Sequence, residues 1–292
     1  MKKTLAMMTA AVMVAGALSG CGSSTATEAA TTAAATEAAT DAATTEAAGN
    51  TAAAAEGTVK TPSGKFTVGF DQEFPPMGFV GDDGQFTGFD LDLAKEVASR
   101  LGLEFVPQPI NWDAKDMELD SGNIDCIWNG FTMQGREDAY TWVGPYMANN
   151  QVFVVTADSD IASKADLAGK AVEVQKDSSG LAALQGDAEL SASFGSMTEV
   201  ADYNTALMDL ESGACDAVCM DSIVAGYQIK SSGKDMKILD DTLSAEEYGI
   251  GFKKGEDELA KAVHDTLMEM KDDGTIAKIS NDWFGSDVFT LK

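Results

Sequence analysis

Residues 84–94 read Gly84-Gln85-Phe86-Thr87-Gly88-Phe89-Asp90-Leu91-Asp92-Leu93-Ala94, and they lead into a helical pattern. From Asp90 to Leu101 the apolar residues recur three and four positions apart, which predicts a helix with one buried face. A strand is predicted before this helix at 66–70, and two strands are predicted after it at 103–106 and 124–127. The alternation of strand and helix predicts parallel sheets that are covered by helices.

The same alternation restarts in the second half of the chain. A strand at 152–156 is followed by the predicted strand at 171–175, a helix after Ser178, a helix near 203–211 and a strand at 214–220. A last strand at 248–253 leads into C-terminal helices. The folded part therefore belongs to the α/β class, and its roughly 230 residues suffice for two ordinary domains.

The N-terminus has the pattern of an export signal. Met1-Lys2-Lys3 is positive, and the apolar run 5–18 is too short to span a membrane comfortably. The following Leu18-Ser19-Gly20-Cys21 resembles the lipobox of bacterial lipoproteins, in which cleavage before the cysteine exposes it for acylation, for example by palmitate. We expect residues 1–20 to be a lipoprotein signal peptide and Cys21 to carry the lipid that holds the chain at a membrane. An ordinary signal peptide with an accidental cysteine is the alternative.

Residues 21–60 contain the expected lipidated cysteine and then a segment dominated by Ala, Thr, Ser and Glu. Without aromatic or large aliphatic side chains between 22 and 57, this segment cannot build a core, and a disordered tether is predicted. The formal net charge of the chain is -27, so nucleic acid and anionic membrane surfaces are not expected as partners, because both are bound by basic patches.

The sequence offers no catalytic or metal-binding constellation. Cys126, Cys215 and Cys219 lie in apolar runs, and we expect them to be small buried core residues rather than a redox or metal set. His264 falls on the polar face of a predicted helix. No Ser/His/Asp set, metal cluster or phosphate-binding loop is recognisable, so we expect neither a cofactor nor an enzyme.

Several short motifs carry a resemblance to a known family. Phe74-Pro75-Pro76 followed by the 84–94 stretch resembles the opening segment of the amino-acid-binding proteins of bacterial ABC importers, the extracellular solute-binding protein family 3. The resemblance continues over 65–284, through these segments: Gly122-Asn123-Ile124-Asp125, Asn129-Gly130-Phe131-Thr132, Asp177-Ser178-Ser179, Cys215-Asp216-Ala217 and Asp221.

The resemblance implies a type II periplasmic-binding-protein-like fold, with two α/β lobes joined by two hinge crossovers. Lobe one is expected at 65–154 plus 249–292 and lobe two at 157–247, with the crossovers near Val155 and Tyr248. The implied function is extracytoplasmic capture of an amino acid at the outer face of the cell membrane, and delivery to ABC importer permease subunits by cleft closure. We expect a monomer that contacts the membrane only through its lipid anchor.

An α-amino acid requires donors for its carboxylate and a carboxylate for its ammonium. Arg136 is predicted to bind the ligand carboxylate, helped by these residues: Thr132, Ser179, and the backbone around Gly130 and Ser178. Only three residues separate Thr132 from Arg136, whereas the family usually has four, and a solvated Arg136 at a helix start is the alternative. Asp221 is predicted to take the ammonium, helped by Asn129, unless it merely caps a helix beginning at Ser222.

The side chain of the ligand is expected to meet aromatic walls and one acid. Phe74 and Trp112 are the candidate walls, and Trp128 is equally a wall or a core residue. By resemblance, Asp71 faces the end of the cleft that holds the ligand side chain; otherwise it caps a turn. If it faces the cleft, acidic ligands are disfavoured, and the candidates are arginine, lysine, histidine, glutamine and cystine.

Two other function classes use the same fold by resemblance. Extracytoplasmic enzymes such as cyclohexadienyl dehydratases and membrane-bound lytic transglycosylases need a positioned proton donor or base. No additional catalytic domain or His-centred arrangement is recognisable here. An amino-acid-sensing module is the other alternative, and a chromosomal neighbourhood with permease and ATPase genes would favour import over both.

Overall fold

The helix predicted at 90–101 is α1 (Phe89–Leu101) in the computed structural model, which describes Thr61 and residues 63–292. The predicted signal peptide, Cys21 and the tether lie outside the described residues. Among the described residues, no helix combines the length and apolar character that crossing a membrane would require.

The N-terminal half supplies a group of three parallel strands, which we call the first strand group. It consists of β5 (Glu104–Pro109), β1 (Lys65–Phe70) and β6 (Cys126–Thr132), in that spatial order. Between β5 and β6 the chain forms a short helical turn, η1 (Trp112–Ala114), and α2 (Lys115–Ser121). A small antiparallel sheet precedes α1 and contains β2 (Glu73–Phe74), β3 (Gly78–Val80) and β4 (Phe86–Thr87).

The following part of the chain supplies a second strand group, which is also parallel. It consists of β10 (Ala217–Asp221), β8 (Ala171–Gln175) and β9 (Ser196–Val200). Its other elements are η2 (Lys164–Leu167), α3 (Ser179–Gly186), α4 (Ala188–Ser193), α5 (Tyr203–Ser212) and α6 (Ser222–Ser232). The strand β9 was not predicted, because most of its side chains are exposed at the edge of the sheet.

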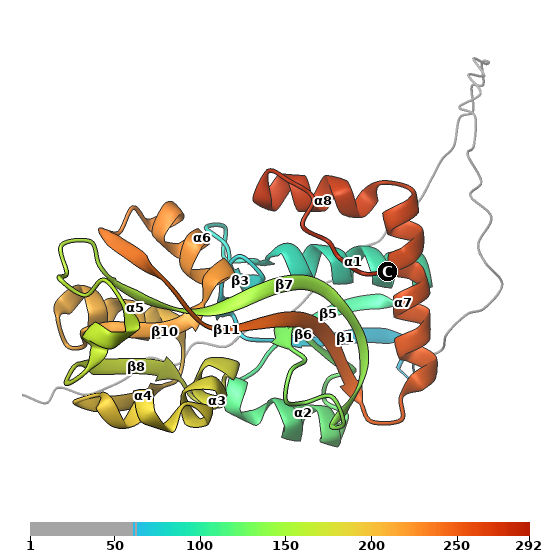
Figure 1. Ribbon diagram of the computed structural model, residues 1–292. Helices are drawn as coiled ribbons and strands as arrows, with labels where there is room; N and C mark the ends of the chain where they lie inside the picture. The colour runs from blue at the N-terminus through green and yellow to red at the C-terminus, as the bar shows by residue number, and fades with distance from the viewer. Residues whose placement is uncertain (1–60, 62) are drawn as a thin grey trace, which may run out of the picture. The chain divides into compact units, whose positions relative to one another are not determined.

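Two long antiparallel strands join the two groups into one eight-stranded sheet. They are β7 (Tyr140–Thr156) and β11 (Met236–Lys253), and the strand order is β5-β1-β6-β11-β7-β10-β8-β9. Figure 1 shows both strands running from one group to the other. On β7, Val152–Val154 pair with β10, whereas the part of β7 before Met147 pairs with the end of β11, which lies beside β6. The lobe boundaries and the crossovers near Val155 and Tyr248 stay predictions.

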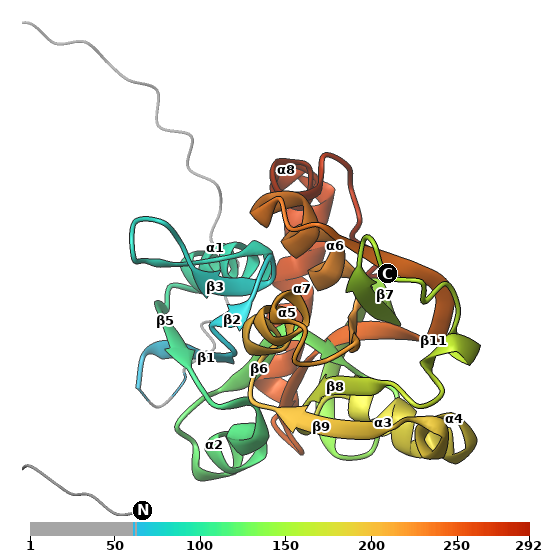
Figure 2. The same ribbon diagram turned by 90° about the vertical axis from the view of Figure 1, so that its left-hand side faces the viewer.

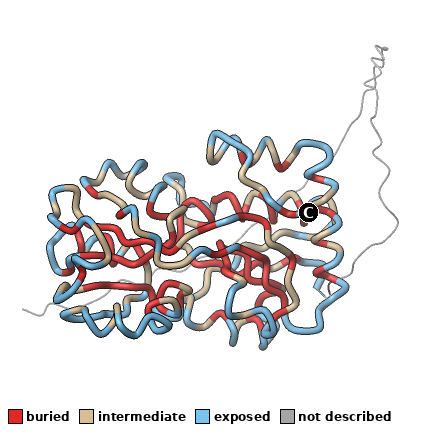
Figure 3. The backbone as a smooth tube through the Cα atoms, in the orientation of Figure 1, coloured by how far each residue is buried: buried red, intermediate tan, exposed pale blue. Residues whose placement is uncertain are grey.

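Helices cover both faces of the sheet (Figures 1 and 2). Two more helices follow β11, namely α7 (Asp257–Asp272) and α8 (Thr275–Phe284). In the first group α1, α7 and α8 pack against one another, while α2 packs on β1 and β6; in the second group α3 and α5 pack on β8 and β10. Figure 3 shows the buried residues concentrated along the strands. The described cysteines Cys126, Cys215 and Cys219 are free and buried, as predicted, although Cys215 precedes β10.

The start of α1 is fixed by backbone contacts that only glycine permits. The amide of Phe89 donates to the carbonyl of Pro76, and the amide of Asp90 donates to the carbonyl of Met77. Gly88 precedes the helix with a φ of 143°, and a Cβ atom there would lie 2.3 Å from the Met77 carbonyl oxygen. The close approach of these two backbone segments therefore requires glycine at position 88.

Asp90, two residues further on, is a fully buried carboxylate that ties α1 to the sheet. Its Oδ2 accepts hydrogen bonds from the amide of Gly130 at 2.7 Å and from the hydroxyl of Tyr146 at 2.8 Å. Burial raises the pKa of Asp90 to about 7, while these hydrogen bonds act in the opposite direction. Asp90 thereby holds β6 and β7 against the start of α1.

We predict that Gly88→Ala destabilises the protein by about 3 kcal/mol or more, because the new methyl group collides with a backbone carbonyl that cannot rotate away. Gly84→Ala is the matched control: Gly84 also has a positive φ, of 76°, but its Cβ position meets nothing within 4 Å. That variant should lose only about 1 kcal/mol from the backbone conformation. Urea unfolding measures both values, and an equal loss in the two variants would contradict the account.

The raised pKa of Asp90 gives a second prediction, on stability as a function of pH. The folded chain keeps a proton on Asp90 that the unfolded chain releases above about pH 4, so unfolding becomes easier as the pH rises from about 4 to about 7. The melting temperature should therefore fall from about pH 5 to about pH 8, and Asp90→Asn should make this fall smaller. Asp82→Asn, which changes an exposed acid nearby, should follow the wild type. Parallel curves for all three proteins would exclude Asp90 as the group responsible.

Candidate functional site

A pocket lies between the first and second strand groups. Its lining residues come from both groups: Phe74, Trp112, Gly130, Thr132, Arg136, Gln175, Ser178, Ser179 and Asp221. These include all of the predicted site residues except Asp71 and Asn129, and Gln175 is an addition. The empty space in this pocket is about 230 Å³.

Asp71 and Asn129 lie beside this pocket as a connected pair. The Asn129 side-chain oxygen accepts from the amide of Asp71 at 3.0 Å, which fixes the turn after β1. One oxygen of Asp71 accepts from the amide of Glu73, as a turn-capping residue would, but the other accepts from Nε2 of Gln175 at 2.7 Å. Gln175 lines the pocket and belongs to the second strand group. Asp71 thus caps a turn and also binds a residue of the second strand group, while its place beside a ligand side chain stays a prediction.

Gly130 brings the backbone of β6 close to the pocket aromatics. Its φ is 56°, and a Cβ atom at this position would lie 2.9 Å from Phe74 and 3.1 Å from Tyr248. A side chain at position 130 would consequently fill space that the rings now occupy. Because Asp90 accepts the Gly130 amide, the packing at the start of α1 also fixes this wall of the pocket.

Arg136 reaches the pocket despite the short spacing after Thr132. The amide of Arg136 donates to the carbonyl of Met133 at 3.0 Å, which closes a tight turn, and Gly135 within it has a φ of 79°. The guanidinium donates to the carbonyls of Thr132 and Asp177, and it lies 5.1 Å from the centre of the Phe131 ring. No described carboxylate lies within ion-pair distance of Arg136. The loss of one residue from the usual spacing is thus accommodated by the turn.

Asp221 is buried at the end of β10, where it receives three side-chain hydrogen bonds. Oδ1 accepts from Asn149 Nδ2 at 2.7 Å and from the Tyr248 hydroxyl at 2.7 Å, and Oδ2 accepts from the Tyr203 hydroxyl at 3.1 Å. The Asp221 side chain makes no capping bond to α6, which argues against the helix-cap interpretation. Burial, and then the nearby Glu246 carboxylate, raise the pKa of Asp221 to about 8.

The hydroxyl-bearing residues connect the two sides. Ser178 caps α3, since its oxygen accepts from the amide of Leu181 at 3.0 Å. The next residue, Ser179, lies opposite Thr132, and the Thr132 hydroxyl donates to the Ser179 hydroxyl at 3.2 Å. Ser179 also accepts from Gln151 at 3.1 Å. An anion near these groups would find hydroxyl donors, the start of α3 and the Arg136 guanidinium together.

Aromatic side chains form the remaining walls. Phe74 packs against Tyr203 with ring centres 5.8 Å apart, and Trp112 packs edge-to-face on Phe131 at 5.5 Å. Trp128 is fully buried and does not line the pocket, so it is a core residue.

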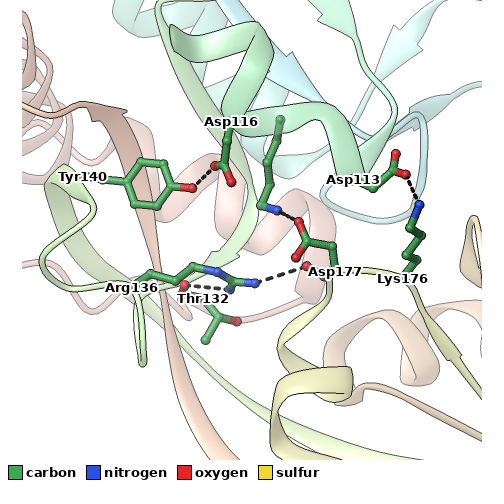
Figure 4. A network of polar contacts seen from close by, with 8 residues as sticks. Asp113, Asp116, Thr132, Arg136, Tyr140, Lys176 and Asp177 are labelled. Carbon is green, nitrogen blue, oxygen red and sulfur yellow. Dashed lines mark hydrogen bonds and ion pairs between the residues drawn. The ribbon is translucent and has the colours of Figure 1, made fainter. Parts of the chain in front are cut away.

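Ion pairs and hydrogen bonds bridge the two strand groups around the pocket. Lys115 pairs with Asp177, and Lys176 pairs with Asp113 at 2.6 Å, so each side supplies one lysine and one aspartate (Figure 4). Figure 4 also shows Arg136 between Thr132 and Asp177. Asn204 donates to Glu73 at another point of the same interface. These contacts hold the two sides together in the arrangement described.

Sequence reasoning missed several polar residues at this site: Lys115, Asn149, Gln151, Gln175 and Glu246. Asn149, Gln151 and Glu246 lie on the two long strands β7 and β11, and all three are buried. A signal was available in the run Asn149-Asn150-Gln151, which interrupts an otherwise apolar strand. Polar residues in the middle of a buried strand require partners, and the partner here is a second strand far away in the sequence.

Comparison with known proteins shows the family of the chain. A family model for bacterial extracellular solute-binding proteins, family 3, matches residues 66–286. The chain is 32% identical over 231 residues to the L-cystine-binding protein TcyJ of Escherichia coli (strain K12), which covers 77% of this chain and 84% of that protein. It is also 32% identical over 229 residues to the L-cystine-binding protein TcyA of Bacillus subtilis (strain 168), covering 77% and 83% respectively.

A solved structure is similar as well. It is an ABC uptake transporter substrate binding protein from Streptococcus pneumoniae with bound histidine, and the match has a TM-score of 0.76 and 34% sequence identity over 78% of this chain and 96% of that chain. The fold of the described residues is accordingly that of the type II periplasmic amino-acid-binding proteins. The chain belongs to the bacterial extracellular solute-binding proteins of family 3.

Proposed function

We propose that the protein captures an amino acid outside the cytoplasm and delivers it to an ABC importer by closing its two sides around the ligand. The observation that carries this proposal is the charge arrangement of the pocket. Arg136 and Asp221 line the same pocket, and among the described residues neither has an ion-pair partner of opposite charge. An α-amino acid carries the complementary pair of charges on adjacent groups.

The carboxylate of the ligand would lie at the end of the pocket that holds Arg136. The guanidinium now donates only to backbone carbonyls, so its donors can turn to a carboxylate without breaking an ion pair. Thr132 and Ser179 would supply hydroxyl donors, and the backbone near Gly130 and Ser178 would assist.

The ammonium of the ligand would lie against Asp221. A cation beside this carboxylate would offset the effect of burial that now raises its pKa. The side-chain oxygen of Asn129 binds the amide of Asp71, so Asn129 would help the ammonium through its backbone oxygen.

The side chain of the ligand would extend between Phe74 and Trp112 toward Gln175 and Asp71. Burial raises the pKa of Asp71 to about 6, so the carboxylate is mostly ionised near neutral pH and would repel an acidic ligand. Arginine, lysine, histidine, glutamine and cystine fit this end. Relatives named for cystine, histidine and arginine support the same group of ligands.

Binding should be tested by calorimetry with these five amino acids and glutamate. We expect at least one of the five to bind and to raise the melting temperature, and we expect glutamine to bind more tightly than glutamate.

Arg136→Ala should weaken binding by about 30-fold or more, because it leaves the buried carboxylate of the ligand without its partner at a cost of roughly 2 to 5 kcal/mol. Asp71→Asn should narrow the preference for glutamine over glutamate.

The control variant is Arg100→Ala, which removes the chain's other arginine from ion pairs with Glu96 and Asp273 that lie outside the pocket. It should bind with wild-type affinity. If none of the five amino acids binds, the proposed function is refuted. If a folded Arg136→Ala protein keeps the wild-type affinity, another residue binds the carboxylate of the ligand.

We also propose that Cys21 is the acylated N-terminus of the mature protein, and the support is the Leu18-Ser19-Gly20-Cys21 motif. Cys21→Ala should release the protein from the membrane fraction, whereas Ser23→Ala should leave it there. A Cys21→Ala protein that still sediments with membranes as the wild type does would refute the anchor.

A further inference from the structure

Two buried carboxylates lie next to each other where the long strands pass between the two groups. The relative exposure of Asp221 is 3% and that of Glu246 is 5%. Neither carboxylate has a lysine, arginine or histidine within 4.0 Å among the described residues. Two ionised carboxylates in such a site repel each other and have lost their hydration, so full ionisation of both is strongly disfavoured.

One amide group connects the two acids. Nδ2 of Asn149 donates to Asp221 Oδ1 at 2.7 Å and to Glu246 Oε1 at 2.6 Å. Asn149 and Glu246 are direct partners in the pairing of β7 with β11, so the register of these strands fixes the arrangement. Glu246 Oε1 also accepts from Gln151 at 2.9 Å and from the Ser179 hydroxyl at 3.4 Å.

The other titratable groups that face this pair do not supply a positive charge. Tyr203 on α5 and Tyr248 on β11 donate to Asp221, and burial raises the pKa of both hydroxyls well above the usual value. Cys219 on β10 is a buried thiol whose pKa is raised in the same way. Arg136 and Lys176 line a neighbouring hollow together with Glu246, but neither forms an ion pair with it.

We propose that Glu246 is a second carboxylate of the ammonium site, and that Asp221 beside it keeps a proton until the ammonium of the ligand replaces that proton. The inference rests on the proposed function. Its balance is simple: the protonated pair plus the cationic end of the ligand gives the ionised pair, the bound ammonium and one proton released to solvent. Glu246 would add its negative charge to that of Asp221 beside the ammonium, and Asn149, which donates to both carboxylates, would hold the two in place.

The direction of the pH effect follows from this exchange. The pKa of Asp221 is raised to about 8 by burial and by Glu246, so the ligand must displace a proton at any lower pH. The apparent affinity should therefore rise about tenfold for each pH unit between about 5.5 and 7.5. A pocket with one ordinary, ionised aspartate would show almost no change over this range.

The first test uses wild-type protein and calorimetry with L-glutamine, L-arginine and L-lysine, whose side chains keep their charge over the range studied. The amino acid that binds most tightly is titrated in phosphate and in Tris, which have different ionisation enthalpies. If one proton is released, the two binding enthalpies should differ by close to the difference between the ionisation enthalpies of the two buffers. Equal enthalpies in the two buffers would overturn the inference while leaving amino-acid binding intact. No binding of any amino acid would remove the proposed function and this inference with it.

The second test compares Glu246→Gln with its exposed neighbour variant Glu247→Gln over the same pH range. Glu246→Gln should bind more weakly than wild type near pH 8. Its affinity curve should converge with the wild-type curve toward about pH 5.5, because the variant releases a smaller fraction of a proton when the ligand binds. Glu247→Gln should follow the wild type throughout. A Glu246→Gln curve that is parallel to wild type would reduce Glu246 to a structural role and overturn the inference. If this variant does not fold, the buffer comparison on wild type still decides.

Discussion

The buried carboxylate of Asp90 joins three parts of the chain that are far apart in sequence. It stands at the start of α1, accepts the amide of Gly130 on β6 and the hydroxyl of Tyr146 on β7, and thereby fixes one wall of the pocket. The approach of α1 to this place depends in turn on Gly88, where the backbone of Met77 passes too closely for any side chain. The position of the pocket thus depends on a buried acid whose hydrogen-bond donors come from other parts of the fold.

Much of the fold could be predicted from local patterns. The apolar spacing of 90–101 predicted α1, because one face of this helix is buried. The run 171–175 predicted β8, because nearly the whole strand is buried. The lengths of β7 and β11 could not be predicted. Buried polar residues such as Asn149 and Glu246 interrupt their apolar pattern, and their partners are set by strand register rather than by sequence spacing. The edge strand β9 could not be predicted either, because most of its side chains are exposed and it lacks an apolar pattern.

The site was predictable where a motif carried it and not where three-dimensional pairing creates it. Arg136 and Asp221 stand at positions that resemble a family pattern, and both line the pocket. Glu246, Gln175 and Lys115 acquire their surroundings only when the two strand groups meet. The shared feature of the site is charge without an ion-pair partner. The half-buried Arg136 guanidinium donates only to backbone carbonyls, and the two buried carboxylates accept from neutral donors. A zwitterion that enters this pocket would balance both ends at once.

The central claim is that an amino acid is enclosed by movement of the two strand groups relative to each other. The most direct measurement is the distance between spin labels on exposed positions of α2 and α3, introduced by Asp120→Cys and Gln185→Cys, while the described native cysteines are buried. The account predicts a longer and broader distance distribution without ligand, and a single shorter distance with the most tightly bound amino acid at saturation. The same distribution with and without saturating ligand would contradict capture by closure.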